Sequence, residues 1–282
     1  SNNTAVGFRS LFENTTGASN SAFGLNSLYT NTTGASNVAV GQDALFALTT
    51  ADNNVAVGKG AGVAATTGEQ NTILGQACAE ALTTGDDNIA IGHDAADNLT
   101  TGGQNIAIGV DTSLSAAGGA NQIVMGQNVT CTGNDNFTFG NGTNDSNIAF
   151  GATSITAPSD VRLKEDIQDE EVGLDFINDL RPVTFQWKKE KDIPSEMKAY
   201  KEGSEDRTMN GKYNHGFIAQ EVKETIDSHN LKEGFDMWSE DEADGRQRVA
   251  PNALMSVMVK AVQELSTQVD ELKQELKTLK GE

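Results

Sequence analysis

The sequence predicts a mainly β repeat protein: a trimeric parallel β-roll or β-helix, followed by a small α/β domain that ends in a long coiled-coil helix. Three observations support this prediction. A short motif recurs every seventeen residues through the first part of the chain. The composition changes abruptly near Ser159, and the last thirty residues have the apolar spacing of a coiled coil.

Glycines punctuate the first part of the chain at a constant interval, which is the signature of a solenoid. Each glycine closes a five-residue unit such as NVAVG or NIAIG. The glycines are Gly7, Gly24, Gly41, Gly58, Gly75, Gly92, Gly109 and Gly126. A second signal, TTG, recurs in phase with the first. We therefore assign residues 1–126 to a rod of stacked coils, spaced about 4.8 Å apart.

Each five-residue unit predicts a short strand with two different faces. In NIAIG the two β-branched residues point to one face and the alanine points to the other. We expect the Ile/Val face to fill the interior of the coil and the small Ala face to lie against a neighbouring subunit. The glycine is expected where a turn needs a positive φ or a tight backbone approach, and the asparagine is expected to hydrogen-bond the backbone in the turn. Weaker segments such as ALFALTTA would form the return side of the coil.

Several alternative roles for the repeats are disfavoured. The segment GKGAG at 58–62 lacks the residue order of a phosphate-binding loop. GDDN and GNDN lack the spacing of a calcium loop, and His93 occupies a variable repeat position that predicts a solvated side chain. Cys78 and Cys131 have no partner motif, so we expect buried or inert thiols. We therefore predict no cofactor and no metal.

The charge balance argues against nucleic acid as a partner. The chain has a net charge of −20, with two basic and twelve acidic residues before Ser159 and eighteen basic and twenty-eight acidic residues after it. Binding to phosphates needs clustered Lys and Arg, which neither part has. No apolar run approaches the roughly 20 residues of a membrane span, and no signal peptide is visible. The absence of an initial methionine is what an excised fragment would show.

The repeat changes after Gly126. The spacing shortens to fourteen residues at Gly140 and then to eleven at Gly151, with NFTFG and NIAFG as the last recognisable units. Aromatic residues replace Val and Ile there. Residues 127–158 are therefore expected to form a tapering β transition, with interleaved chains as one option.

Residues 159–252 have the mixed pattern of an α/β domain. An amphipathic helix is predicted before Pro182, and an alternating strand follows it; the apolar positions are Val172, Leu174, Ile177 and Leu180 in the helix and Val183, Phe185 and Trp187 in the strand. The segment HGFIAQEVKETI predicts a short strand leading into a second helix. The charged stretch 188–212 is expected to loop outward.

Residues 253–282 predict a helix with a narrow apolar seam. The seam residues are Leu254, Met258, Ala261, Leu265, Val269, Leu272, Leu276 and Leu279. Steps of four and three dominate, and one extra step of four near Val269 would locally unwind a supercoil. A coiled coil is favoured over a helix packed only on its own domain, and the β-rod favours three strands.

Four motifs in order, SDVRLKEDI, L-RPVTFQW, HGFIAQEV and LMSVMVKAVQEL, together resemble the intramolecular chaperone domain at the end of phage endosialidases, tail spikes and tail fibres. This resemblance covers residues 159–282. The repeats at 1–126 are similar to the head repeats of trimeric adhesins and to phage tail-fibre shafts. The resemblance implies a homotrimer on a virion tail, attached to upstream fibre segments, with a host surface receptor or glycan as a possible ligand of the rod.

The resemblance also implies that the domain cuts itself off. Cleavage would fall between Ser159 and Asp160, with Ser159 and Lys164 forming a serine-lysine dyad. His215 matches a histidine of the family motif and would orient the site or stabilise an oxyanion, or instead make a structural hydrogen bond at a strand start. Arg248 is a weaker match, for which a salt bridge is favoured over catalysis.

The residues leave the chemistry of this cut open. Lysine acts as a general base only when burial or a neighbouring cation lowers its pKa. Arg162 would supply such a cation or would bind a carboxylate. Attack by Ser159 on its own carbonyl would close a strained four-membered ring, so a serine of an adjacent chain or an activated water is considered instead.

Two other functions compete with this interpretation. A surface adhesin could retain the same domain as a permanent trimerisation foot without any cleavage. A glycan-degrading enzyme is a third option, but the rod shows no convincing pair of carboxylates.

Overall fold

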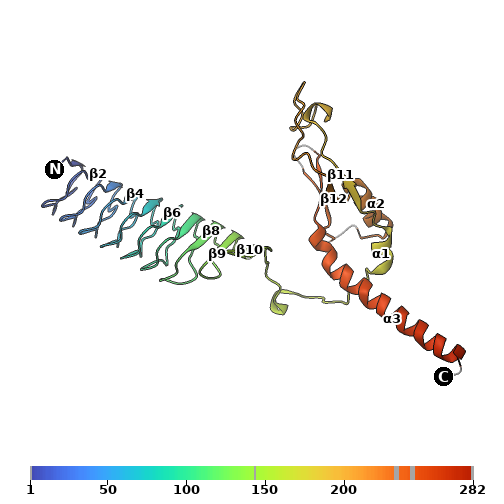
Figure 1. The fold of residues 1–282 in the computed structure, drawn as a ribbon. Coiled ribbons are helices and arrows are strands. Elements are labelled where there is room, and N and C mark those ends of the chain that lie inside the picture. The colour runs from blue at the N-terminus through green and yellow to red at the C-terminus, as the bar shows by residue number, and fades with distance from the viewer. Residues whose placement is uncertain (1, 143, 232–234, 242–244, 281–282) are drawn as a thin grey trace. The chain divides into compact units, whose positions relative to one another are not determined.

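The computed structural model describes the chain except for residues 1, 143, 232–234, 242–244 and 281–282. It divides into two compact units, Ser1–Glu165 and Asp166–Glu282 (Figure 1). The first unit contains the repeats, and the second contains the helices together with two small sheets.

The first unit is a β-solenoid in which each coil contributes one short strand. Its strands are β1 (Thr4–Val6), β2 (Ser21–Phe23), β3 (Val38–Val40), β4 (Val55–Val57), β5 (Thr72–Leu74), β6 (Ile89–Ile91), β7 (Ile106–Val110), β8 (Gln122–Gln127), β9 (Asn136–Asn141) and β10 (Asn144–Ala149). These strands form a single sheet in chain order, seen as a ladder of coils in Figure 1. The prediction of a β-solenoid is confirmed.

The register of the sheet follows the period of the sequence. From β1 to β8 each residue pairs with the residue seventeen positions later, as Ala39 does with Ala56. Between β8 and β9 the offset is fourteen, so that Gln122 pairs with Asn136. The strand β10 pairs antiparallel with β9 and ends the parallel series. The shortened spacing at Gly140 therefore marks the last parallel pairing.

The two faces of each strand are the reverse of those expected. The central residue of each strand from β2 to β6 is buried, and the residues before and after it are partly or largely exposed. Ala39 is fully buried, whereas Val40 is 36% exposed. The expectation that Val and Ile fill the interior and that Ala meets a neighbour is therefore wrong.

The reason for this reversal is the small volume inside a seventeen-residue coil. The interior is filled mainly by leucines from the return side, among them Leu28, Leu45 and Leu48, and only a small residue fits opposite them. Where the strand instead carries Ile73, the return side carries Gly62, at which an added Cβ would lie only 2.8 Å from Ile73 Cδ1. The Val and Ile side chains are thereby left on the outer surface.

A ladder of buried asparagines joins each strand start to the neighbouring coils. Asn54 Oδ1 accepts from the backbone N–H of Asn71 at 3.0 Å, and Asn54 Nδ2 donates to the carbonyl of Gly68 at 2.9 Å. The same contacts repeat along the rod at Asn20, Asn37, Asn71, Asn88 and Asn105. The predicted role of asparagine in bonding the backbone is confirmed.

Both cysteines are buried and free. Burial raises the pKa of the Cys78 thiol to about 12. A thiol that stays protonated is a poor nucleophile, as expected of an inert interior residue.

The second unit packs three α-helices with two short hairpins. Its elements are α1 (Leu174–Asp179), β11 (Val183–Phe185), β12 (Asn214–Gly216), α2 (Ala219–Ser228), β13 (Trp238–Glu240), β14 (Gln247–Val249) and α3 (Leu254–Lys280), with 3-10 turns at η2 (Glu190–Asp192) and η3 (Pro251–Ala253). β11 pairs antiparallel with β12, and β13 with β14. The predicted helix before Pro182, the strand after it and the strand-to-helix segment at HGFIAQEV are all present.

The core of the second unit lies between α1, α2 and the start of α3. Phe176 and Val257 are almost fully buried there. Glu264 in α3 accepts from the backbone N–H of Leu174 at 2.8 Å and so caps the start of α1. The charged stretch 188–212 folds back on itself, with Lys189 and Lys191 paired to Glu205.

Most apolar residues of α3 separate into two sets, and Val259 is exposed outside both. Leu254, Val257 and Ala261 are buried in the domain. A second set is exposed and follows steps of three and four without interruption: Met255, Met258, Val262, Leu265, Val269, Leu272, Leu276 and Leu279. We call this set the α3 seam. The extra four-residue step expected near Val269 disappears, because Ala261 belongs to the core and Val262 takes its place in the seam.

Candidate functional site: the junction after Pro158

The predicted cleavage bond lies in an exposed connecting segment. Residues 150–171 are all exposed in the chain. A single 3-10 turn, η1 (Val161–Leu163), follows the bond, and the Asp160 carboxylate caps this turn by accepting from the backbone N–H of Arg162 at 2.9 Å. The turn reverses the chain and brings Lys164 back towards Ser159.

Ser159 and Lys164 are in direct contact. Lys164 Nζ lies 2.8 Å from Ser159 Oγ, within hydrogen-bond distance. This is the geometry required of a nucleophile and a base. Both side chains are exposed.

Arg162 binds a carboxylate, one of the two roles considered for it. Its guanidinium forms a two-pronged contact with Asp160, with Nε 3.0 Å from Oδ1 and an ion pair at 2.5 Å. The Arg162 side chain and its backbone N–H lower the pKa of the Asp160 carboxyl. The residue after the predicted cut is therefore held as a carboxylate beside a cation.

His215 and Arg248 belong to the second unit. His215 is exposed on β12 and pairs with Thr184 of β11. It borders a shallow apolar groove together with Phe185, Phe217 and Val249. Arg248 on β14 forms a two-pronged ion pair with Asp241, at 2.6 and 2.7 Å. The salt bridge favoured for Arg248 is thus present.

Sequence reasoning missed Asp241 as the partner of Arg248. Asp241 lies in the acidic run SEDEADG, which predicts solvated loop residues. Asp241 directly follows β13, and its backbone N–H donates to the carbonyl of Arg246, so the side chains of Arg246 and Arg248 both reach it. The signal that could have identified this pair is an acidic residue at the end of one predicted strand and two arginines, two positions apart, at the start of the next.

Comparison with known families matches one segment of the chain. Residues 159–231 match the family described as chaperone of endosialidase. The match begins at Ser159, the residue before the predicted cut, and ends shortly after α2. No curated protein and no solved structure matches the chain. A β-solenoid followed by such a segment fits a tail fibre or spike with a C-terminal chaperone domain.

Among the described residues, the structure contains no helix with both the length and the apolar character needed to cross a membrane.

Proposed function

We propose that the chain is the C-terminal part of a trimeric phage tail fibre or spike, and that its last domain releases itself after directing assembly. The observation that carries this proposal is the family match beginning at Ser159, directly after a β-solenoid. The mature rod would lie on the virion tail, joined to upstream fibre segments. A host receptor or surface glycan would be its ligand.

The fold gives such a domain a physical task. Neighbouring coils are so alike that strands of three chains could pair one repeat out of register, at offsets of seventeen residues. Non-local pairing is also slow, because loop closure precedes the contacts that stabilise it. A helical clamp at one end raises the effective concentration of the chains and sets their alignment.

Two exposed apolar surfaces support assembly from three copies. One is the α3 seam, from Met255 to Leu279. The other is the outward strand face of the solenoid, which exposes Phe23, Val40, Val57 and Ile89 by 36% to 40%. The α3 seam follows its helix, and the strand face crosses successive coils of the solenoid, so copies of each unit can bury these surfaces against one another.

The cleavage step is a peptide hydrolysis. Either the Ser159 hydroxyl of an adjacent chain or a water activated by the dyad adds to the carbonyl carbon of Ser159, the bond to the nitrogen of Asp160 breaks, and that nitrogen leaves as an amine after gaining a proton. Attack by the serine leaves an ester that water then hydrolyses, so both routes end in the same two fragments. Lys164 would take a proton from the nucleophile, which requires its neutral form. Because Lys164 is exposed in one chain, the burial that favours the neutral amine would come from the other chains, and cutting would follow assembly.

The test is the intact mass of freshly expressed protein. Wild-type chain should yield a fragment of 123 residues, Asp160 to Glu282. Ser159→Ala and Lys164→Ala should remain whole, and Ser154→Ala, in the same exposed segment, should be cut normally. Uncut wild-type trimer, or a break elsewhere, would contradict the proposed cleavage.

Mixed trimers test whether the dyad acts between chains. Ser159→Ala and Lys164→Ala chains are co-expressed with different tags. Cleavage in mixed trimers, absent from either variant alone, supports action between chains. Complete absence of cleavage from the mixed trimers argues against action between chains.

A permanent trimerisation foot is the second candidate. The observation favouring it is that Ser159 and Lys164 are exposed and that Arg162 is already paired with Asp160. In that case the wild-type chain stays whole while still forming trimers.

A further inference from the structure

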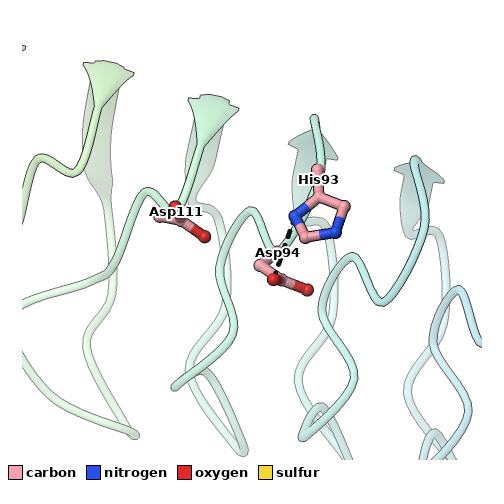
Figure 2. Close-up of side chains that lie close together, drawn as sticks. All are labelled: His93, Asp94 and Asp111. Atoms are coloured by element: carbon pink, nitrogen blue, oxygen red, sulfur yellow. Dashed lines mark ion pairs between the residues drawn. The ribbon is translucent and has the colours of Figure 1, made fainter.

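Three side chains that can bind a metal converge on the outer surface of the solenoid. His93 and Asp94 follow β6, and Asp111 follows β7 in the next coil (Figure 2). One ligand atom from each lies within 4.8 Å of the others. His93 Nδ1 is 2.9 Å from Asp94 Oδ2. The cluster therefore joins two consecutive coils.

The backbone holds the two carboxylates in register. Asp94 and Asp111 are equivalent positions one repeat apart, and both have left-handed backbone conformations with φ of 51° and 52°. The backbone N–H of Asp111 donates to the carbonyl of His93 at 3.0 Å. The cluster thus rests on the regular hydrogen bonding of the rod rather than on a free loop.

The same position in other coils shows what this cluster lacks. Asn26 and Asp43 are also equivalent and adjacent, and there Asn26 Nδ2 donates to Asp43 Oδ1 at 2.9 Å. At Asp94 and Asp111, which occupy the same repeat position in two later coils, two carboxylates lie close together and neither is replaced by an amide. Within the described residues, the Asp111 carboxylate has no hydrogen-bond or ion-pair partner. Two like charges one strand spacing apart repel each other.

We infer that His93, Asp94 and Asp111 form a binding site for a divalent first-row transition metal ion, of which Zn²⁺ is the probe. One imidazole and two carboxylates suit Zn²⁺ better than Ca²⁺ or Mg²⁺, which prefer oxygen ligands alone. Zinc needs ligands at about 2.0 to 2.2 Å. Modest side-chain rotations reach this distance, because His93 and Asp111 are exposed. Water completes the coordination, and the ion neutralises the stacked carboxylates.

The repeat supplies variants that the fold already accepts. Asp111→Asn introduces the residue found at the equivalent positions Asn26 and Asn128, which have φ of 55°. His93→Gln introduces the residue found at the equivalent positions 42, 76 and 127. Both variants should fold with unchanged circular dichroism, and in the presence of EDTA neither should melt below the wild type.

The experiment is equilibrium dialysis of the whole chain against Zn²⁺, with metal counted per chain. The wild type should bind one high-affinity ion, and each variant should lower its affinity about tenfold or more. Zn²⁺ should also raise the melting temperature of the wild type alone. Asp43→Asn, at the equivalent position of a coil without histidine, should bind like the wild type.

A second histidine–carboxylate pair provides the competing explanation. His229 Nε2 lies 2.8 Å from Asp179 Oδ2 in the second unit. Loss of the high-affinity ion in His229→Gln but not in His93→Gln would overturn the inference. Equal binding by wild type, His93→Gln and Asp111→Asn would overturn it too, as would failure of the wild type to bind Zn²⁺.

Discussion

Only glycine fits at the end of each strand from β1 to β8, because the backbone of the next coil lies too close for a Cβ atom. Gly75 has φ of 144°, and a Cβ added there would overlap the carbonyl oxygen of Gly92. Gly60, in the GKGAG segment, has φ of 70° and open space around it, and Ala77 occupies the equivalent position of the following coil. That segment is therefore part of the coil geometry, in line with its departure from a phosphate-binding loop.

This contrast predicts two different outcomes for the same substitution. Gly75→Ala should destabilise the solenoid by about 3 kcal/mol or more, because backbone of the adjacent coil must move. Gly60→Ala should change stability by about 1 kcal/mol or less, since a left-handed alanine already fits at Ala77. Urea unfolding followed by circular dichroism measures both. Similar losses for the two variants would refute the argument from close packing.

The asparagine ladder predicts that removing one asparagine lowers the free energy of unfolding by a comparable amount. Asn71→Ala removes Oδ1, which accepts from the backbone N–H of Asn88, and Nδ2, which donates to the carbonyl of Gly85. Two buried backbone groups then lose their partners, at about 1 to 3 kcal/mol each. Gln42→Ala is the control: the Gln42 side chain is exposed and hydrogen-bonds the Asp43 side chain, so this variant should unfold at nearly the wild-type urea concentration.

At the level of the element, α3 combines two interfaces on one helix. Its first turns contribute Leu254, Val257 and Ala261 to the core of the second unit, while the α3 seam continues beyond that core to Leu279. Seven alternating steps of three and four are the heptad pattern of a left-handed coiled coil. The seam therefore has the pattern needed to join copies of the chain.

This arrangement predicts that the seam controls association without controlling the fold. Leu272→Gln should weaken association between copies of the chain, because each copy would lose about 1.5 to 3 kcal/mol of apolar burial at the seam. Val259→Gln, on the same helix and 54% exposed but off the seam, should leave association unchanged. Sedimentation equilibrium of the two variants decides the matter, and equal association constants would exclude the seam as the interface.

The sequence predicts the elements better than their orientation. The seventeen-residue period appears directly in Gly58 and Gly75 and sets the register, because each coil stacks on an equivalent one. Alternation shows which residues share a face, but it does not show which face is inside. That depends on the volume between strand and return side, which the structure shows by burying large residues such as Leu45 and small ones such as Ala56 in one core.

The candidate sites were predictable to different degrees. Ser159 and Lys164 come together because a short turn separates them, and the resemblance identified both. The cluster at His93 was missed because that residue was considered alone. The seventeen-residue offset between Asp94 and Asp111 predicts their stacking, but placing His93 beside them requires the geometry of the turn after β6.

At the scale of the whole molecule, the proposed function makes the alignment of a rod of similar coils depend on another part of the chain. Under the proposed function, removing residues 254–282 should sharply reduce the yield of trimeric rods after refolding, since the coils from β1 to β7 are too alike to set the alignment of the chains. Analytical ultracentrifugation of the refolded protein measures this. Recovery of ordered trimers in normal yield would show that the solenoid aligns itself.

The constant offset between equivalent residues also makes the length of the rod adjustable in whole units. Excising residues 55–71 joins Asn54 to Thr72, and Asn71 already precedes Thr72 in the same ladder position. The remaining coils would meet the same neighbours as before, and the rod would shorten by one strand spacing, about 4.8 Å. Insertion or loss of a complete repeat would therefore change the length of such a rod while its core residues keep the same contacts.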